Sequence, residues 1–478
     1  MNRSSTLSIL VLLISVINLT ATTAWSQKLA QRQAWQFETV AGKRTIVDHG
    51  NRRWVTYYPN GTTAECEELD RTPEYLEIRN AANQAVLRLY GSFGTVRKTP
   101  EGPFKRFAAG HWLQDEDAPA SASPFGTTDY KIRVVYFVPQ DRKPTSNYQD
   151  KIDVVLTLIS DVMTRDLRSK GLETDGPQFE QRDGKTIVHL LRGNKKAREY
   201  SDLPNFNSVR HFTSITGEVE RRLGSLRDHI VVIFAETYED GPADRVWAGH
   251  VARAVANPPN GGGAVFSAWM LRDELCATDI PAQRRGFVDP TPIRGRTAIG
   301  HRGPDSPRSE FIEDGIGGML HELAHTFGLP HDHRAKRVDI MGEGFRNLRW
   351  NVTPTHGGRQ HATFSNESAW LLMASRYLNS SVNRADNQPP QARLEANRNG
   401  QGVSLTVTAT DEHKLAAVVV LDHSGQDRKL IAGQRLSGKR QIIKQELPWS
   451  LLPSGNVRLQ VIVVDSGGNH TKLTGINL

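Results

Sequence analysis

The stretch GIGGMLHELAHTFGLPHD, residues 315–332, carries the strongest structural signal in the sequence. Apolar residues in and just before it recur every three or four positions, the spacing that places side chains on one face of a helix. They are Ile312, Ile316, Met319, Leu320, Leu323 and Phe327. His321 and His325 are four residues apart, so their imidazoles should lie one turn apart on one face. The stretch therefore predicts a helix that presents two imidazoles to a common point.

A third imidazole follows the predicted end of this helix. Gly328 can adopt a positive φ and end the helix, and Pro330 prevents its continuation. Both residues favour a turn that returns His331 toward the helical histidines. Zinc binds neutral imidazole nitrogens, and catalytic zinc sites use three protein ligands. We therefore expect His321, His325 and His331 to bind Zn²⁺.

The residues leave other choices open for the third ligand. Glu343, Glu367 and His333 all follow the helix and carry suitable donor atoms. The spacing His-x-x-Gly-x-x-His favours His331 over these three. Glu322 is adjacent to the first histidine and rotated away from it on the helix. Its carboxylate is therefore expected to act on a water molecule at the metal rather than to bind the metal.

The segment HELAHTFGLPHD resembles the signature of the metzincin clan of zinc endopeptidases, HExxHxxGxxH followed by a methionine turn. Met341, within the run Asp-Ile-Met-Gly, is the candidate for that methionine. Asp332 matches a position where adamalysin-like members carry aspartate, and it is a candidate for supporting the ligands from behind. Glu343 stands two residues past Met341, where some members have a tyrosine ligand, so a tyrosine ligand is not expected. The resemblance implies a zinc endopeptidase with Glu322 as general base.

The same resemblance makes two predictions about the fold. The metzincin sheet has an antiparallel edge strand that binds extended substrate by strand addition, and residues 263–270 are the candidate. A helix is expected after the methionine turn. Residues 366–378 fit it, and Ser365 is a suitable N-cap.

The predicted catalytic domain covers residues 129–380, and its pattern mixes helix and strand. Apolar runs at residues 130–138, 187–191, 230–235 and 264–269 predict strands. Ile152, Val155, Leu156, Ile159 and Val162 recur at helical spacing, and Gly171 should end that helix. We expect an α/β (α+β) domain with one mixed sheet and an active-site helix.

β-rich segments flank this domain. Residues 27–115 alternate in short runs that end in turn signals, which predicts a small β-rich module. We expect its Trp35 and Trp54 to lie in a core rather than to stack on sugars. Residues 116–128, rich in Ala, Ser, Pro and Gly, are a predicted linker, and residues 381–391 are a second one. Residues 392–478 alternate without a helical segment, which predicts an immunoglobulin-like β-sandwich.

Residues 1–26 have the pattern of a secretory signal peptide: Arg3, an apolar run at residues 7–19, and small residues before a cleavage site. That run is short for a membrane span, although an uncleaved anchor is the alternative. We therefore expect a secreted or extracytoplasmic protein with no stable membrane span after signal removal. Cys66 and Cys276 either form one disulfide or remain two free thiols.

The chain has 478 residues, and 60 Lys and Arg against 52 Asp and Glu give a net charge of +8. The positive charge is spread along the chain without a basic stripe, so nucleic-acid binding is not expected. The expected activity is zinc-dependent cleavage of a protein or peptide substrate, with the β modules as candidates for binding a glycan or a cell surface. The alternatives are a surface-binding or adhesion protein with a degenerate peptidase domain, and a zinc amidase acting on a cell-wall polymer.

Overall fold

The computed structural model describes residues 34–39, 42–48, 52–58, 62–72, 74–112, 129–201, 208–238, 253–298, 304–353, 361–425, 427–452 and 457–477. The predicted signal peptide and the predicted linker at residues 116–128 lie outside these residues. The chain divides into two compact units, Met1–Asp129 with Val219–Gly224, and Tyr130–Glu218 with Ser225–Leu478. The structure is α+β, with a mixed sheet, helices and additional β-rich regions.

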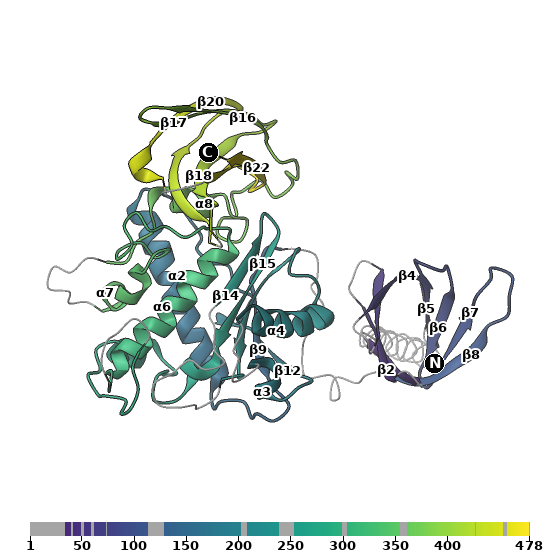
Figure 1. Ribbon diagram of the computed structural model, residues 1–478. Coiled ribbons are helices and arrows are strands. Elements are labelled where there is room, and N and C mark those ends of the chain that lie inside the picture. The colour runs from purple at the N-terminus through teal and green to yellow at the C-terminus, as the bar shows by residue number, and fades with distance from the viewer. Residues whose placement is uncertain are drawn as a thin grey trace, which may run out of the picture. The chain divides into compact units, whose positions relative to one another are not determined.

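The first unit contains a closed barrel of eight strands in chain order, β1 to β8 (Figure 1). Neighbouring strands are antiparallel, and β1 pairs with β8 to close the barrel. Trp35 and Trp54 are both 0% exposed within its core, which confirms the prediction that they are core residues. The strands are Ala34–Thr39, Gly42–Asp48, Arg53–Tyr57, Thr63–Arg71, Tyr75–Asn80, Val86–Tyr90, Phe93–Arg97 and Lys105–Trp112.

Both cysteines are buried, free thiols. Cys66 lies on β4 of the barrel, where its sulfur is 3.8 Å from the Thr56 hydroxyl oxygen. Cys276 belongs to the apolar core of the second unit. Of the two alternatives that the sequence leaves open, the structure therefore has the unpaired one.

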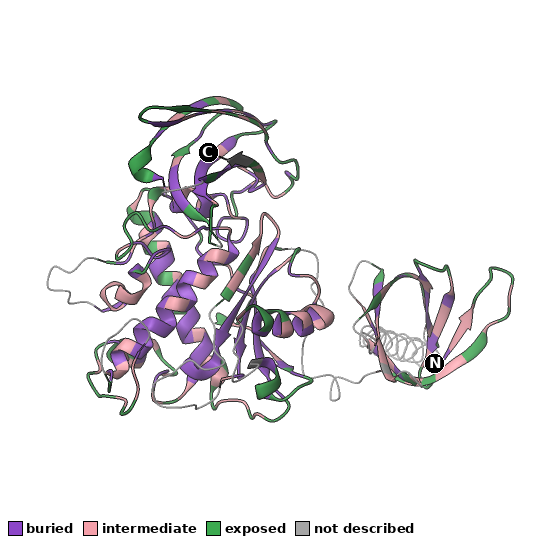
Figure 2. Ribbon diagram, viewed as in Figure 1, coloured by how far each residue is buried: buried purple, intermediate pink, exposed green. Residues whose placement is uncertain are grey.

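A five-stranded sheet with the order β12-β9-β13-β15-β14 forms the centre of the second unit. The first four strands are parallel, and β14 is antiparallel to β15. Strands β9, β13 and β15 are buried along their whole length, as expected for parallel strands covered on both faces (Figure 2). The five strands are β9 (Arg133–Val138), β12 (Val188–Arg192), β13 (Ile230–Ala235), β14 (Arg253–Asn257) and β15 (Gly261–Ser267).

The prediction that residues 263–270 form the antiparallel edge strand is wrong. This stretch contains most of β15, which is parallel to β13 and lies inside the sheet, followed by the 3-10 turn η1 (Ala268–Leu271). Ala264, Val265 and Phe266 are each 0% exposed, and an edge strand would leave such a run partly uncovered. The antiparallel edge strand is β14, a short strand with exposed and half-buried residues, and β12 forms the opposite, parallel edge.

Helices cover this sheet and provide the frame of the site. The predicted helix around Ile152 is α2 (Tyr148–Ser169), and Gly171 with φ of 70° follows its end as expected. The predicted helix after the methionine turn is α8 (Asn366–Met373), which is shorter than expected, and Ser365 caps it by accepting from the Ser368 N–H. The remaining elements are the hairpin β10–β11 (Gln181–Arg182 and Lys185–Thr186), α3 (Ala197–Ser201), α4 (Ser208–Leu223), α5 (Ile280–Gly286), α6 (Arg308–Thr326), η2 (Gly344–Asn347) and α7 (Arg349–Val352).

The C-terminal part of the second unit is a seven-stranded sandwich of two antiparallel sheets. One sheet has the order β16-β17-β20 and the other β19-β18-β21-β22. The short 3-10 turn η3 (Trp449–Leu451) follows β20. The strands are β16 (Gln391–Asn399), β17 (Gly402–Thr410), β18 (Leu415–Asp422), β19 (Lys429–Arg435), β20 (Arg440–Pro448), β21 (Arg458–Asp465) and β22 (His470–Asn477).

One sheet of the sandwich is buried on both faces. Along β18, Val418 and Val420 belong to the sandwich core, whereas Val419 and Leu421 belong to the apolar cluster that also contains α6 and α8 residues. Alternate side chains of a strand point to opposite faces, so β18 separates two apolar cores. This explains the unbroken run Val418-Val419-Val420. The sandwich and the central sheet thus form one compact unit.

None of the helices described here is both long and apolar enough to span a membrane.

Candidate functional site

Helix α6 places His321 and His325 on one face, as the sequence predicts. The helix is nearly fully buried and packs against β14, β15 and α2. Gly317 permits close packing on one side, because a β-carbon there would lie 2.1 Å from the Phe345 carbonyl oxygen. Phe345 in turn contacts His321, with ring centroids 5.1 Å apart. The small residue in the helix thus lets the segment after the methionine turn approach the first histidine.

The turn after α6 returns His331 toward the helix. Gly328 has φ of 95°, in the region that glycine adopts most readily, and its N–H donates to the His325 carbonyl oxygen at 2.9 Å. The backbone of His331 is then fixed by β19 of the sandwich. Its N–H donates to the Arg428 carbonyl oxygen at 3.2 Å, and its carbonyl oxygen accepts from the Leu430 N–H at 2.8 Å. Two parts of the fold far apart in sequence therefore hold the third imidazole.

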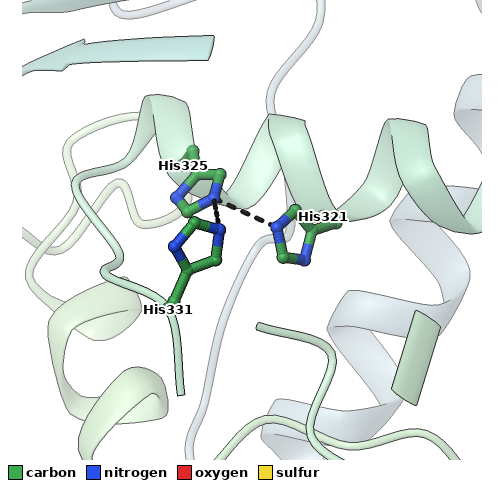
Figure 3. A group of neighbouring side chains, drawn as sticks. All are labelled: His321, His325 and His331. Carbon is green, nitrogen blue, oxygen red and sulfur yellow. Dashed lines mark hydrogen bonds between the residues drawn. The ribbon is translucent and has the colours of Figure 1, made fainter. Parts of the chain in front are cut away.

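The Nε2 atoms of the three histidines converge on one point (Figure 3). The Nε2 of His325 lies 3.1 Å from that of His321 and 3.2 Å from that of His331. One ring nitrogen from each residue lies within 4.8 Å of the other two. The rings of His321 and His331 are 30° from parallel, and the His325 ring is nearly perpendicular to both. This is a compact set of three nitrogen donors from one helix and one turn.

The tautomers of the two helical histidines are determined by backbone carbonyl groups. The Nδ1 of His321 lies 2.6 Å from the Ile340 carbonyl oxygen, and the Nδ1 of His325 lies 2.7 Å from the Leu329 carbonyl oxygen. A carbonyl oxygen can only accept, so each Nδ1 carries the proton and each Nε2 presents a lone pair. Two lone pairs 3.1 Å apart with no proton between them repel each other. A cation at the point where they meet would remove this repulsion, and the donor set fits zinc.

Burial also keeps these imidazoles neutral. It lowers the pKa of His321 to about 4 and that of His325 well below the ordinary value, because a charged ring would lose its hydration. The pKa of the less buried His331 is lowered in the same direction and for the same reason. Neutral imidazole is the form that binds a metal ion.

Glu322 lies beside the edge strand of the sheet. Burial raises the pKa of its carboxyl group to about 7, while the positive charge of Arg253 and a hydrogen bond with the backbone of Ala254 act in the opposite direction. Both of these residues belong to β14. Glu322 is not among the groups that gather their ligand atoms with the histidines. Its position therefore matches a role beside the donor set and not within it.

Met341 lies in a tight, buried turn, as expected. Met341 is 0% exposed, and its N–H donates to the Asp339 carboxylate at 2.7 Å. The Gly342 N–H donates to the Asp339 carbonyl oxygen at 2.9 Å. The same turn contains Ile340, whose carbonyl oxygen accepts from His321. The turn thus orients one histidine of the cluster directly.

Asp332 supports the site through an ion-pair network. The Arg334 guanidinium donates to the Asp332 carboxylate at 2.6 Å and to the Glu367 carboxylate at 2.7 Å. Burial raises the pKa of Asp332, but the bonds from Arg334 outweigh it and the net pKa is lowered. The Asp332 N–H also donates to the Met341 carbonyl oxygen at 3.0 Å. Asp332 therefore ties the segment after His331 to the methionine turn.

The three alternative ligands lie outside the donor set. Glu367 is paired with Arg334, and Glu343 forms an exposed ion pair with Lys336 at 2.7 Å. His333 is exposed, and its ring centroid lies 5.8 Å from that of His331. None of the three joins the group of converging ligand atoms. Among the described residues, His331 is the one whose ring nitrogen joins those of His321 and His325.

Sequence reasoning missed the backbone groups that hold the histidines. The carbonyl groups of Ile340 and Leu329 and the pairing of His331 with β19 carry no side-chain signature. A partial signal was present in the unbroken apolar run of β18, which indicates a strand that is buried on both faces.

No family model matches this chain, and no curated protein matches it. Among solved structures, it is similar to OgpA from Akkermansia muciniphila. A catalytically inactive form in complex with an O-glycopeptide substrate, glycodrosocin, is 13% identical over 72% of this chain and 91% of that chain, with a TM-score of 0.49. A wild-type crystal form is 14% identical over 72% of this chain and 92% of that chain, with a TM-score of 0.47.

Proposed function

We propose that this chain is a zinc-dependent endopeptidase of the metzincin type, with His321, His325 and His331 as the zinc ligands. The observation that carries the proposal is the convergence of three Nε2 atoms, of which the two on α6 have their Nδ1 protons committed to backbone carbonyl oxygens. Such a set provides two Nε2 lone pairs and a third imidazole at one point. Zinc held there would acidify a water molecule and polarise the scissile carbonyl group.

Glu322 is the proposed general base. A base works best when its pKa is near the working pH, and burial raises the pKa of this carboxyl group to about 7. Its carboxylate would accept a proton from the attacking water and return it to the leaving amine. The adjacent position of Glu322 and His321 on α6 supports this division of roles between base and ligand.

The edge strand β14 is the proposed substrate platform. Among the described strands, only β15 pairs with β14, and the two are antiparallel. An edge strand offers backbone groups to an extended peptide, which can add to the sheet as a further strand. Arg253 and Ala254 on this strand interact with Glu322, so a peptide added along β14 would run beside the base. This arrangement favours a peptide as the substrate.

The decisive test replaces Glu322 with glutamine. Glu322→Gln removes the base and keeps the side-chain shape, so we expect stoichiometric zinc by metal analysis and no cleavage of a fluorogenic peptide library. Glu310→Gln, on the first turn of the same helix, is the matched control and should keep both zinc and cleavage. Cleavage retained in Glu322→Gln would reject Glu322 as the base.

The ligand set is tested separately with a neighbouring pair of histidines. His331→Ala should lose zinc, whereas His333→Ala, two residues further on, should retain it. Full zinc content in His331→Ala would contradict the proposed ligand set. The substrate class is tested by offering a peptide library and a cell-wall polymer, each with and without chelator. If only the cell-wall polymer were cleaved, and only without chelator, the result would reject the endopeptidase and support a zinc amidase.

A further inference from the structure

A second cluster of metal-binding side chains lies in the C-terminal part of the second unit, away from the three histidines. One ligand atom each of Asp386, Asp411 and His413 lies within 4.8 Å of the others. Asp386 precedes β16, and the other two residues are in the turn between β17 and β18. The turn between β21 and β22 also contributes, since Asn469 donates to the Asp386 carbonyl oxygen and to the Asp465 carboxylate, both at 3.0 Å. The cluster thus connects the segment before β16 with the β17–β18 and β21–β22 turns of the sandwich.

Two carboxylate oxygens in this cluster are buried without a donor. Asp386 is 3% exposed and Asp411 is 8% exposed. In each residue Oδ1 is satisfied by backbone N–H groups, from Gln388 in one case and from His413 and Lys414 in the other. The Oδ2 atom of each has no hydrogen-bond donor among the described residues. A buried carboxylate oxygen without a donor or a cation is strongly unfavourable.

The charges nearby do not resolve this deficit. Arg376 is fully buried beside the cluster, but its guanidinium donates to neutral oxygens, among them the Gly467 carbonyl oxygen at 2.7 Å and the carbonyl oxygen of Asp386. The Nδ1 of His413 lies 3.3 Å from Asp386 Oδ2, a contact that is an ion pair only when the imidazole is protonated and that lacks the geometry of a hydrogen bond. Gly467 also closes the space, because a β-carbon there would lie 2.8 Å from Asp386 Oδ2. Two carboxylate oxygens and one imidazole nitrogen therefore face one another, and among the described residues no hydrogen bond reaches either oxygen.

We propose that Asp386 Oδ2, Asp411 Oδ2 and His413 Nδ1 form a second metal site, which binds a divalent cation. Carboxylate oxygens suit hard cations such as Ca²⁺ and Mn²⁺, and the imidazole adds a donor that Mn²⁺ and Zn²⁺ accept. His413 has a half-exposed side chain and provides an opening to solvent. The site is structural: the ion would tie the segment before β16 to the β17–β18 turn of the sandwich. It does not depend on peptide cleavage or on the three-histidine site.

The test measures the thermal stability of the full chain after chelator treatment, with CaCl₂ and MnCl₂ added back separately. At a concentration one hundred times the dissociation constant, the wild-type Tm should rise by about 5 °C. Asp411→Asn should show no such rise. In chelator alone it should be at least as stable as wild type, because it lacks one of two facing negative charges. Asp422→Asn alters a similarly buried aspartate at the end of β18 and should respond as wild type does.

The two salts and a histidine variant identify the ion and the donors. A response to Ca²⁺ indicates that oxygen donors dominate, and a response to Mn²⁺ alone indicates that the imidazole is essential. His413→Ala should weaken binding by about tenfold or more. Unchanged affinity in His413→Ala would overturn the three-donor site. The whole proposal fails if wild type responds to neither salt, or if Asp411→Asn responds as strongly as wild type. Should Asp411→Asn not fold, Asp386→Asn provides the same comparison.

Discussion

Leu430 and Ile431 of β19 test whether the sandwich supports the third histidine. The two side chains are adjacent and buried, at 3% and 6% exposure, but they point to opposite faces. Leu430 belongs to the apolar cluster that contains α6, and Ile431 belongs to the sandwich core. The Leu430 N–H also donates to the His331 carbonyl oxygen. Replacing each with alanine removes similar apolar volume on either side of one strand.

The expected loss of stability is similar for both variants. Each substitution loses about 0.8 kcal/mol for every buried carbon removed, plus the cost of the cavity, which gives about 2–4 kcal/mol. The effect on zinc should differ. In Leu430→Ala the start of β19 no longer packs in the apolar cluster that contains α6. The His331 backbone, which is hydrogen-bonded to Leu430, should therefore become more mobile. If this loosening accounts for about 1.4 kcal/mol of that loss, zinc binding weakens about tenfold.

The assay combines thermal unfolding with competition against a chromophoric zinc chelator at a temperature where both variants are folded. We expect a similar fall in Tm for the two variants and a weaker zinc affinity in Leu430→Ala alone. Equal zinc affinities in the two variants would refute the reasoning. They would show that packing of β19 against the α6 cluster does not fix the position of His331.

Three further outcomes follow from local features of the structure. Gly328 has φ of 95°, and a β-carbon added there would lie 3.4 Å from the His470 side chain. We therefore expect Gly328→Ala to lower the free energy of unfolding by about 1 kcal/mol or more and to weaken zinc binding. Gly171→Ala, at φ of 70° with open space around it, should lower stability without affecting zinc binding. His211 is buried, which lowers its pKa to about 4, so at this residue the unfolded chain binds more protons than the folded chain between pH 6.5 and 4. His211 should therefore contribute roughly 3 kcal/mol to the fall in stability as the pH falls through this window. His211→Gln should reduce the total fall by about that amount, while other buried histidines such as His321 keep their own contributions. Burial raises the pKa of the Cys276 thiol to about 12 and also raises the pKa of the Cys66 thiol. We therefore expect neither cysteine to react with a thiol reagent in the native protein and both to react in denaturant. Rapid labelling of the native protein would contradict this expectation.

The donor set was predictable because its spacing is local. His321 and His325 are related by one helical turn, and Gly328 and Pro330 restrict how the chain leaves the helix. Helix geometry and turn chemistry alone therefore bring His331 close to the other two. The same locality explains the success with α2, with the cap at Ser365 and with strand β13.

Features that depend on pairing between distant segments were not predictable in the same way. The N-terminal module reads as β-rich, but its closure requires β1 to pair with β8, with Trp35 opposite Trp112. The prediction of residues 263–270 as the edge strand rests on their place before helix α6 in the sequence, whereas the observed strand β14 is short and only partly buried. A long apolar run is more typical of a central strand, which is covered on both faces. The alternation of apolar residues predicts that a segment is a strand. The position of that strand in the sheet depends on which other strands pair with it, and the alternation carries no information about them.

The sandwich is better understood as part of the unit that holds the three histidines than as an appended module. Val419 and Ile462 lie in the same apolar cluster as Leu323 of α6 and Leu372 of α8. A chain that ended before β16 would expose those apolar side chains to water and remove the strand that pairs with His331. Burial of both faces also limits what this sheet can bind, because a face packed against α8 is not open to a glycan or a cell surface. Any ligand of the sandwich must therefore use its other sheet or its turns.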